Sequence, residues 1–510
     1  MTKAVQSQRT CSRHLSLRWA GVKLLLLAFM VTSALPSPAQ TFTTIVRFRQ
    51  SYGIGGAPYS APTQGKNGNM YGAVGYGGVD GSGYEITSKG SLLVLYDPSG
   101  IPVPGTFGNL LLTASGNFYS TSFWGGNEQS GAVFEMTPTG EATLLYQFCG
   151  PTCVYGSSPY DTLALGPDGN FYGTTLAGGA SEGINGCGDG CGTVFTMTPE
   201  GELTTLHNFC LQSGCPDGGF PFDGLTLGAN GNFYGTTSNG GAHDGGTVFE
   251  ITPAGELTTL YNFCSQPSCT DGWNPRSGLI LAADGNFYGT TYLGGSDTTG
   301  CVDSGCGTVF KITPTGTLTT LYSFCSQTMC ADGSEPTDAL MQATDGNFYG
   351  TTQYRGGKNS GTLFKITPTG TLTTLHSFCS QPGCSDGAQP LAGLTQATNG
   401  VLYGSTSQGG IDESGTIFTF SNSLPPFAET VPAFGKVGAE VIILGNNLTG
   451  TTSVSFNGTS AAFTVLSDTD IRATVPSRAT SGTVEVTTPR GTLNSNVAFM
   501  VLASGSVLRP

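Results

Sequence analysis

Short runs in which apolar and polar residues alternate fill the chain between residues 41 and 420. Residues 221–263 show the pattern best, because an apolar segment is followed by runs at 232–237, 247–252 and 257–263 that are rich in Thr, Phe, Tyr, Val and Ile. Turns containing Gly, Asn or Pro separate these runs. Alternating β-branched and aromatic residues between such turns predict four short antiparallel strands. Helical periodicity with caps is absent after residue 39, so the predicted fold class is all-β.

The four-strand unit occurs seven times. Its marker is Gly-Asn-Phe-Tyr-Gly-Thr-Thr, with a Gly-Gly pair a few residues later. Successive markers lie 48, 53, 62, 54, 61 and 54 residues apart, so each copy is a supersecondary unit that buries its apolar face against a neighbour. The marker tyrosines are Tyr71, Tyr119, Tyr172, Tyr234, Tyr288, Tyr349 and Tyr403.

Seven such units predict a seven-bladed β-propeller over residues 41–420. A β-helix is the alternative, but its coils are much shorter than these spacings. The last unit ends at Phe420 without an outer strand, and the run at 41–48 has the sequence of that missing strand. We expect this N-terminal run to pair with the last unit and close the ring, which removes exposed strand edges.

Propeller connectivity assigns the loops to two faces. One face carries short turns, whereas the other carries the Gly-Gly pairs, the insertions and the cysteines. Variable loops on a rigid scaffold are the usual place for a binding site.

Fourteen of the fifteen cysteines form seven close pairs. An even count behind a signal peptide predicts disulfides, whereas short-spaced pairs without histidine partners leave a four-cysteine zinc site as the alternative. Cross-pairing between neighbouring loops stays open. The expected pairs are Cys149 with Cys153, Cys187 with Cys191, Cys210 with Cys215, Cys264 with Cys269, Cys301 with Cys306, Cys325 with Cys330, and Cys379 with Cys384.

The first 39 residues have the layout of a secretory signal peptide: five basic residues, an apolar run from Leu24 to about Leu35, and Ser37-Pro38-Ala39 at the cleavage site. A membrane anchor is the alternative, but the apolar run is shorter than the ~20 residues that span a bilayer. Cleavage leaves 14 basic and 33 acidic residues, a net charge of −19. This balance disfavours nucleic acid and anionic membranes as partners. We expect a secreted, extracellular or cell-surface monomer, with the periplasm as the alternative.

The composition changes after residue 420. Residues 421–426 predict a linker, and residues 427–502 lack cysteines and Gly-Gly loops. Runs at 432–438, 441–448, 454–458 and 471–476 resemble an IPT/TIG domain, which implies an immunoglobulin-like sandwich and a role as spacer or attachment module. Alternating short strands support a sandwich independently. Residues 503–510 form a tail without a hydrophobic stretch.

The repeats themselves resemble a bacterial family. The marker, Gly-Thr-Val-Phe-Lys-Ile-Thr-Pro-Thr-Gly and Leu-Thr-Thr-Leu-Tyr-Ser-Phe-Cys resemble the GloVer tandem repeat of choice-of-anchor proteins. The resemblance covers residues 41–420 and implies an exported protein without known catalytic residues. Units one and two depart from the pattern at residues 68–73 and at Ser120.

Catalytic chemistry has little support in the sequence. His207 and His376 occupy a position that is Tyr in sister units, which indicates packing or an edge contact. The Asp-Gly pairs of the cysteine loops indicate turns, with calcium as the weaker alternative, and no other cofactor or metal is expected. Aromatic side chains near the Gly-Gly pairs and in one cysteine loop are expected to pack the Gly-rich loops against each other, and the alternative is that they are exposed for sugar stacking or peptide capture. The candidate binding residues are Tyr76, Phe123, Trp124, Trp273, Tyr292 and Tyr354.

The sequence therefore favours an exported, non-enzymatic binding protein that presents disulfide-clipped loops to a polysaccharide or protein partner. The alternative is a secreted polysaccharide lyase or glycoside hydrolase with its site on the same face. Such an enzyme needs paired carboxylates or a metal, which residues from different blades would have to supply.

Overall fold

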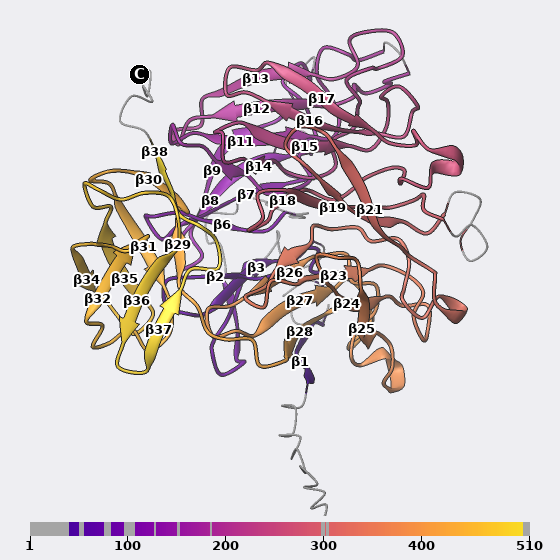
Figure 1. Ribbon diagram of the computed structural model, residues 1–510. Coiled ribbons are helices and arrows are strands. Elements are labelled where there is room, and N and C mark those ends of the chain that lie inside the picture. The colour runs from indigo at the N-terminus through magenta and orange to yellow at the C-terminus, as the bar shows by residue number, and fades with distance from the viewer. Residues whose placement is uncertain are drawn as a thin grey trace, which may run out of the picture. The chain divides into compact units, whose positions relative to one another are not determined.

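Strands form where the sequence alternates, and most of them assemble into four-stranded antiparallel sheets (Figure 1). The computed structural model describes residues 40–49, 56–75, 83–95, 108–126, 129–149, 153–183, 186–296, 301 and 305–502. Helix in these ranges is confined to the 3-10 turns η2 (Pro267–Cys269), η3 (Thr328–Cys330) and η4 (Pro382–Cys384), which confirms the all-β class. The predicted signal peptide at 1–39 and the tail at 503–510 lie outside the described residues.

Seven sheets are built from residues 41–421, one for each sequence repeat. We number them in chain order. Sheet 1 contains β2 (Thr63–Gln64), β3 (Met70–Ala73), β4 (Gly83–Ile86) and β5 (Leu92–Leu95); sheet 2 contains β6 (Leu111–Leu112), β7 (Phe118–Ser122), β8 (Ala132–Met136) and β9 (Ala142–Gln147); sheet 3 contains β10 (Ala164–Leu165), β11 (Phe171–Thr175), β12 (Thr193–Met197) and β13 (Leu203–Asn208); sheet 4 contains β14 (Thr226–Leu227), β15 (Phe233–Thr237), β16 (Thr247–Ile251) and β17 (Leu257–Asn262). Sheet 5 contains β18 (Ile280–Leu281), β19 (Phe287–Thr291), β20 (Thr308–Ile312) and β21 (Leu318–Ser323); sheet 6 contains β22 (Met341–Gln342), β23 (Phe348–Thr352), β24 (Thr362–Ile366) and β25 (Leu372–Ser377); sheet 7 contains β26 (Leu394–Gln396), β27 (Leu402–Thr406), β28 (Thr416–Ser421) and β1 (Thr41–Arg47).

The first strand of each sheet is the shortest. In Figure 1, β2, β6, β18 and β26 lie toward the middle, while β21, β25 and β1 lie further out.

The two aromatic residues of the repeat marker join consecutive sheets. The Tyr172 ring stacks on Phe233 of the next marker, with centroids 4.0 Å apart, and Tyr234 stacks on Phe287 at 4.1 Å. The glycine that follows the tyrosine is required by close packing, because a Cβ at Gly235 would lie 2.6 Å from Cζ of Phe249. The marker is therefore a packing motif that binds each sheet to the next.

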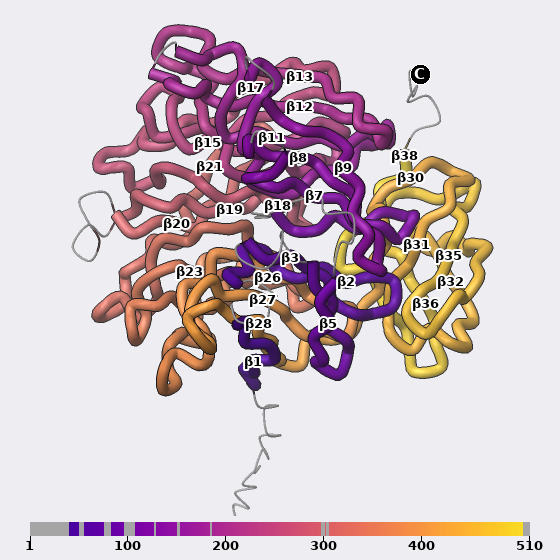
Figure 2. The backbone as a smooth tube through the Cα atoms, turned by 180° about the vertical axis from the view of Figure 1, so that it is seen from behind, coloured from indigo at the N-terminus to yellow at the C-terminus, as the bar shows by residue number. Residues whose placement is uncertain are grey.

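The N-terminal strand completes the last sheet. β1 pairs antiparallel with β28, with Thr41 opposite Ser421, and the two strands lie side by side in Figures 1 and 2. Phe48 then packs against Tyr84 of sheet 1, with ring centroids 5.7 Å apart. Sheets 7 and 1, which are far apart in sequence, thus share one apolar cluster. β28 runs to Ser421, so the strand includes the first residue of the predicted linker.

Residues 427–502 form two four-stranded sheets and one parallel strand pair around a common core. The core side chains include Ile443, Phe456 and Phe499. Val431, Ile442 and Leu444 face the other way, in a cluster with Tyr71 and apolar residues of sheet 2. The strands are β29 (Glu429–Val431), β31 (Glu440–Leu444), β35 (Asp470–Thr474) and β34 (Phe463–Val465); β33 (Thr459–Ser460), β32 (Ser453–Phe456), β36 (Val484–Thr488) and β37 (Gly491–Asn494); and β30 (Phe434–Lys436) with β38 (Met500–Leu502).

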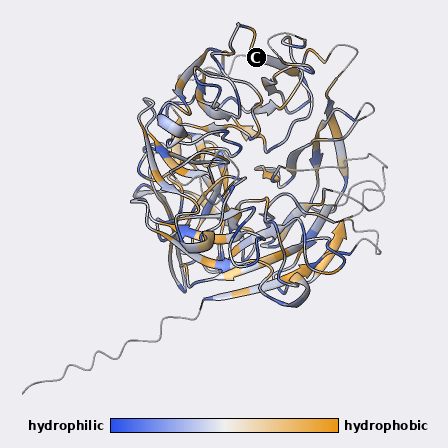
Figure 3. Ribbon diagram, turned by 90° about the vertical axis from the view of Figure 1, so that its right-hand side faces the viewer, coloured by the Kyte–Doolittle hydropathy of each residue, from blue (hydrophilic) through white to orange (hydrophobic). Residues whose placement is uncertain are grey.

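Hydrophobic and hydrophilic residues are interspersed along the ribbons, as expected for strands that alternate (Figure 3). Among the described residues, no helix has the length and apolar character that crossing a membrane would require.

Candidate functional site

All seven predicted cysteine pairs are disulfide-bonded, each within its own pair. Five of the bridges follow the fourth strands of sheets 2 to 6, beginning with Cys149–Cys153 after β9. The other two, Cys187–Cys191 and Cys301–Cys306, lie between the second and third strands of sheets 3 and 5. The predicted disulfide framework is therefore confirmed, with no bridge between neighbouring loops.

Cysteine loops and Gly-Gly loops are hydrogen-bonded to each other. Gly219, after one cysteine loop, forms a β-bridge with Asn239 of the next Gly-Gly loop, and Gly241 N–H donates to the Cys215 carbonyl at 2.8 Å. Both loop types therefore lie on one side of the sheets, and we call them the cysteine-loop layer. The same amide-to-carbonyl bond recurs from Gly179 to Cys153, from Gly295 to Cys269, from Gly356 to Cys330 and from Gly410 to Cys384.

The acidic residue of each Asp-Gly pair caps its own cysteine loop. The Asp271 carboxylate accepts hydrogen bonds from Tyr261 Oη at 2.8 Å and from the Ser265 amide at 2.9 Å. His376 occupies the tyrosine position two repeats later and lies 3.0 Å from Asp386 Oδ2. These histidines and carboxylates form hydrogen bonds that hold the cysteine loops, in agreement with the contact and turn roles that the sequence indicated.

The predicted aromatic residues do not gather at one point. Phe123 and Trp124 form a T-shaped pair with centroids 5.0 Å apart. The Trp273 indole donates to the Asp244 carbonyl at 3.1 Å and so anchors a neighbouring loop. The Tyr354 hydroxyl accepts a hydrogen bond from the side-chain Nε2 of Gln353 at 3.1 Å. Tyr76 lies outside the described residues.

Phe123 and Tyr292 belong to a continuous series of contacts between four aromatic rings and one guanidinium, which crosses four repeats. Phe123 meets Tyr160 edge-on at 5.6 Å, and Tyr160 meets Phe222 at 5.0 Å. The Arg276 guanidinium then lies over Phe222 at 5.2 Å and over Tyr292 at 4.0 Å. We call these five residues the aromatic arc.

Sequence reasoning missed three of the five members. Tyr160, Phe222 and Arg276 each follow a proline that opens a repeat, at Pro159, Pro221 and Pro275. The signal was the residue after that proline, which is aromatic in some repeats and basic in one. A cation–π contact between repeats is invisible without the fold.

Three carboxylates lie directly beside the aromatic arc. Asp161 and Asp223 immediately follow Tyr160 and Phe222, and Asp338 occupies the corresponding position in sheet 6. Burial raises the pKa of Tyr160, the negative charges of these carboxylates raise it further, and the nearby Arg276 opposes the shift. Groups from sheets 3, 4, 5 and 6 therefore converge.

Each of the three carboxylates also holds the next repeat in place. Asp161 accepts the Gly224 amide at 3.1 Å, Asp223 accepts the Gly278 amide, and Asp338 accepts the Gly393 amide. Burial, followed by the charge of Asp161, raises the pKa of Asp223 well above its usual range. Burial, again followed by Asp161, raises the pKa of Asp338 to about 7.

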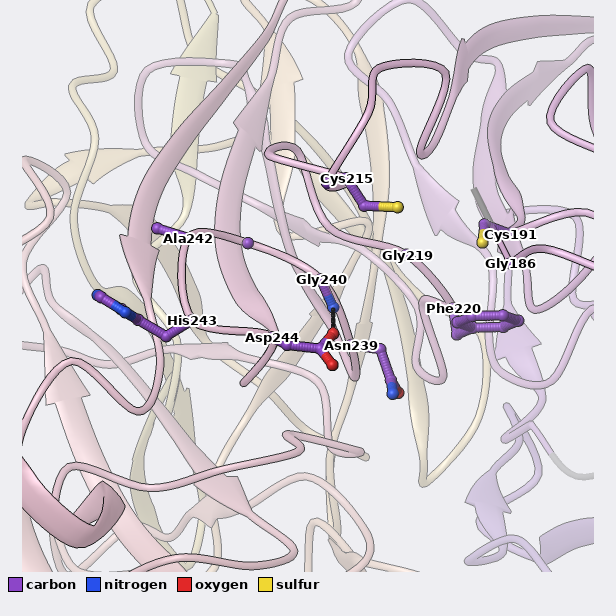
Figure 4. A pocket seen from close by; sticks show the side chains of 12 residues that line it. Gly186, Cys191, Cys215, Gly219, Phe220, Asn239, Gly240, Ala242, His243 and Asp244 are labelled. Atoms are coloured by element: carbon purple, nitrogen blue, oxygen red, sulfur yellow. Dashed lines mark hydrogen bonds between the residues drawn. The ribbon is translucent and has the colours of Figure 1, made fainter. Parts of the chain in front are cut away.

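A separate cleft of ≈ 470 Å³ opens between the cysteine loops of sheet 3 and the Gly-Gly loop of sheet 4 (Figure 4). His243 and Asp244 line it, but the Asp244 carboxylate already accepts a hydrogen bond from the Gly240 backbone amide at 3.0 Å. The remaining lining is mostly glycine backbone with Phe220, Asn239 and two cysteines, and it includes no member of the aromatic arc.

The repeat profile decides the family. The Gloeobacter/Verrucomicrobia repeat matches residues 31–209, 184–418 and 298–466, which together span most of the chain. The chain belongs to the Gloeobacter/Verrucomicrobia repeat family. The resemblance to GloVer repeats is thereby confirmed. No curated protein matches the sequence.

Solved structures that resemble this Gloeobacter/Verrucomicrobia repeat protein share little sequence with it. A fungal alcohol oxidase of the AA5 family, in complex with copper, is 12% identical with a TM-score of 0.51, and the match covers 91% of this chain and 99% of that one. The extracellular domain assigned to a hybrid two-component system of Bacteroides thetaiotaomicron is 10% identical with a TM-score of 0.46, covering 89% and 57%. An auxiliary nutrient binding protein from Bacteroides ovatus is 14% identical with a TM-score of 0.36, covering 61% and 73%. At such identity the alcohol oxidase shows a likeness of fold alone.

Proposed function

We propose that this repeat protein is an exported, non-enzymatic binding protein whose aromatic arc holds a polysaccharide. The single observation that carries the proposal is the unbroken chain from Phe123 through Tyr160, Phe222 and Arg276 to Tyr292. Aromatic faces stack on the apolar faces of sugar rings, and flanking carboxylates accept hydrogen bonds from sugar hydroxyls. A protein partner is the competing ligand.

The scaffold proposed for this site is a closed seven-bladed β-propeller. The pairing of β1 with β28 and the contact of Phe48 with Tyr84 support closure, because both bring the two ends of the repeat region together. We further propose that residues 427–502 are an IPT/TIG domain of immunoglobulin-like fold that serves as a spacer or attachment module. Their two packed four-stranded sheets support this assignment.

Export is proposed on three grounds. Residues 1–39 have the layout of a signal peptide, seven disulfides need an oxidising compartment, and the family resemblance implies exported proteins. An N-terminus at Gln40, measured by mass spectrometry of protein recovered from the producing cell, is the expected result.

Binding is tested on a glycan array and by pull-down with insoluble polysaccharides. We expect wild-type protein to bind, and Phe222→Ala and Arg276→Ala to reduce affinity at least tenfold. Tyr155→Ala is the matched control, because Tyr155 is an aromatic residue of the same loop layer, 52% exposed, and outside the arc. Equal loss in the control, or unchanged binding by the arc variants, would contradict the proposal.

A second candidate is a secreted polysaccharide lyase or glycoside hydrolase. One observation favours it: Asp223 and Asp338 combine raised pKa values with positions beside the arc, which suits a general acid. Release of soluble sugars by the wild type, lost in Asp223→Asn and Asp338→Asn variants that keep the wild-type fold, would establish this candidate over the first.

A further inference from the structure

We infer that the chain contains two four-cysteine clusters that bind zinc when their disulfides are reduced. The first cluster comprises Cys187, Cys191, Cys210 and Cys215. The Sγ atoms of the first three lie within 4.8 Å of one another, and the fourth is bonded to Cys210. The sulfur atoms of two disulfides, which come from different loops of sheet 3, therefore lie close together.

The same arrangement recurs in sheet 5. Cys301, Cys306 and Cys325 also have their Sγ atoms within 4.8 Å of one another, and Cys325 is bonded to Cys330. The repeats of sheets 3 and 5 are the two long ones, and only they carry a second cysteine pair. The inserted loop thus brings its pair onto the bridge of the same repeat in both cases, which indicates a built arrangement.

The geometry suits a tetrahedral thiolate site. Zinc–sulfur bonds of about 2.3 Å place neighbouring sulfurs about 3.8 Å apart, which lies within the 4.8 Å limit observed for three of the four sulfurs in each cluster. Pairs spaced as C-x3-C and C-x4-C are close to the short spacing of structural zinc sites. Cys187, Cys191 and Cys210 are fully or almost fully buried, so a bound ion would be shielded from water.

The cleft of ≈ 470 Å³ provides a route to the first cluster. Cys191 and Cys215, one from each disulfide, line this cleft, and Figure 4 shows both side chains. The cleft therefore approaches each bridge of the first cluster at one of its two cysteines.

Reduction of both disulfides in one cluster takes four electrons and four protons. Two molecules of a phosphine reductant donate four electrons, two water molecules supply the four protons, and two phosphine oxides and four thiols result. One zinc ion then displaces four protons and is held by four thiolates. Reoxidation by a thiol oxidant restores the two disulfides and releases the ion.

The test measures zinc content of the full mature protein, oxidised and phosphine-reduced, after gel filtration. We expect close to zero zinc in the oxidised form and two ions per reduced chain. Cys187→Ser/Cys191→Ser should reduce the count to one, as should Cys301→Ser/Cys306→Ser. Cys264→Ser/Cys269→Ser is the matched control, because this bridge has no second pair beside it, and it should keep two ions.

Cobalt substitution adds a readout that loose surface binding cannot imitate. We expect the visible absorption of tetrahedral cobalt thiolate in reduced wild type, halved in either cluster variant. A reduced protein that retains no zinc, including one that unfolds on reduction, would overturn the inference. Equal metal loss in the control that lacks Cys264 and Cys269 would also overturn it.

Discussion

The carboxylate of Asp223 accepts a hydrogen bond from the backbone amide of Gly278, 55 residues further along the chain and in the next repeat. A side chain at this glycine would collide with its acceptor, because a Cβ on Gly278 would lie 2.8 Å from Asp223 Oδ1. An acidic residue in one repeat and a glycine in the next therefore form a matched pair that sets the distance between sheets.

Gly278→Ala tests this pair. We expect it to lower the free energy of unfolding by about 1–3 kcal/mol, because the methyl group must displace a buried carboxylate from its hydrogen bond. Urea denaturation at equilibrium measures the change. Gly357→Ala is the control, since its Cβ would meet only Ser377 Cβ at 3.8 Å. If both variants lose the same stability, the pairing has no special role.

Asp338→Asn should flatten the dependence of stability on pH. The pKa of Asp338 is raised to about 7 in the folded protein, first by burial and then by Asp161, and the unfolded value is near 3.8. The folded state therefore holds the proton more tightly, so its contribution to stability is full below about pH 4 and is lost as pH rises to about 7.

The measurement is Tm against pH for wild type, Asp338→Asn and Asp412→Asn, in which an exposed loop carboxylate is changed. We expect the fall in Tm between about pH 4.5 and pH 7.5 to shrink by roughly 2–5 °C in Asp338→Asn alone. A slope identical to wild type would show that Asp338 does not titrate as described.

Phe42→Ala should weaken the junction between β1 and the last sheet. The Phe42 ring stacks on His376 at 3.7 Å and packs on Phe418 at 5.1 Å, so it joins sheets 6 and 7. Removing it should cost about 1–3 kcal/mol, since the side chain is only partly buried. Thr43→Ala, at the neighbouring exposed position, should be nearly neutral in the same urea titration.

Deletion of the whole N-terminal strand is a stronger test of the same junction. A protein lacking residues 41–48 would expose the edge of β28, and we expect it to aggregate or to melt well below the full mature chain. Melting at the wild-type temperature would argue against closure by the N-terminal strand.

Tyr261→His should be tolerated, whereas Tyr261→Phe should not. Asp271 accepts from the Tyr261 hydroxyl at 2.8 Å, and His207 and His376 make the equivalent contact to Asp217 and Asp386 at 2.9 and 3.0 Å. We expect a loss of about 1–2 kcal/mol for Tyr261→Phe, which leaves a buried carboxylate with one partner fewer, and less than half of that for Tyr261→His. Thermal melts of both variants decide the point, and the reverse order would contradict it.

The repeat made much of the fold predictable. Phe233 and Tyr234 fall on opposite faces of one strand, and each ring stacks on the marker of an adjacent sheet. The marker, which occurs seven times, therefore indicated the strands and also lies at the contacts between sheets. The disulfide pairing was equally predictable, because the two cysteines of a bridge such as Cys149–Cys153 or Cys210–Cys215 are only four or five residues apart.

The candidate site was less predictable. Asp161, Asp223 and Asp338 occur in three of seven repeats and more than 60 residues separate each from the next, so only the packing of sheets shows that they converge. Arg276 stands where Phe222 and Tyr160 stand in sister repeats, and its contacts depend on register between sheets. Trp273 was predicted as a binding residue from its residue type alone, and its indole donates a hydrogen bond to the Asp244 carbonyl of a neighbouring loop.

Hydrogen–deuterium exchange of the mature protein, with and without a polysaccharide identified on the array, tests binding at the aromatic arc most directly. We predict that ligand slows exchange in peptides covering residues 158–162, 220–224, 274–278 and 290–294, and leaves residues 427–502 unchanged. Protection confined to the cleft at residues 239–244, or to residues 427–502, would contradict the account.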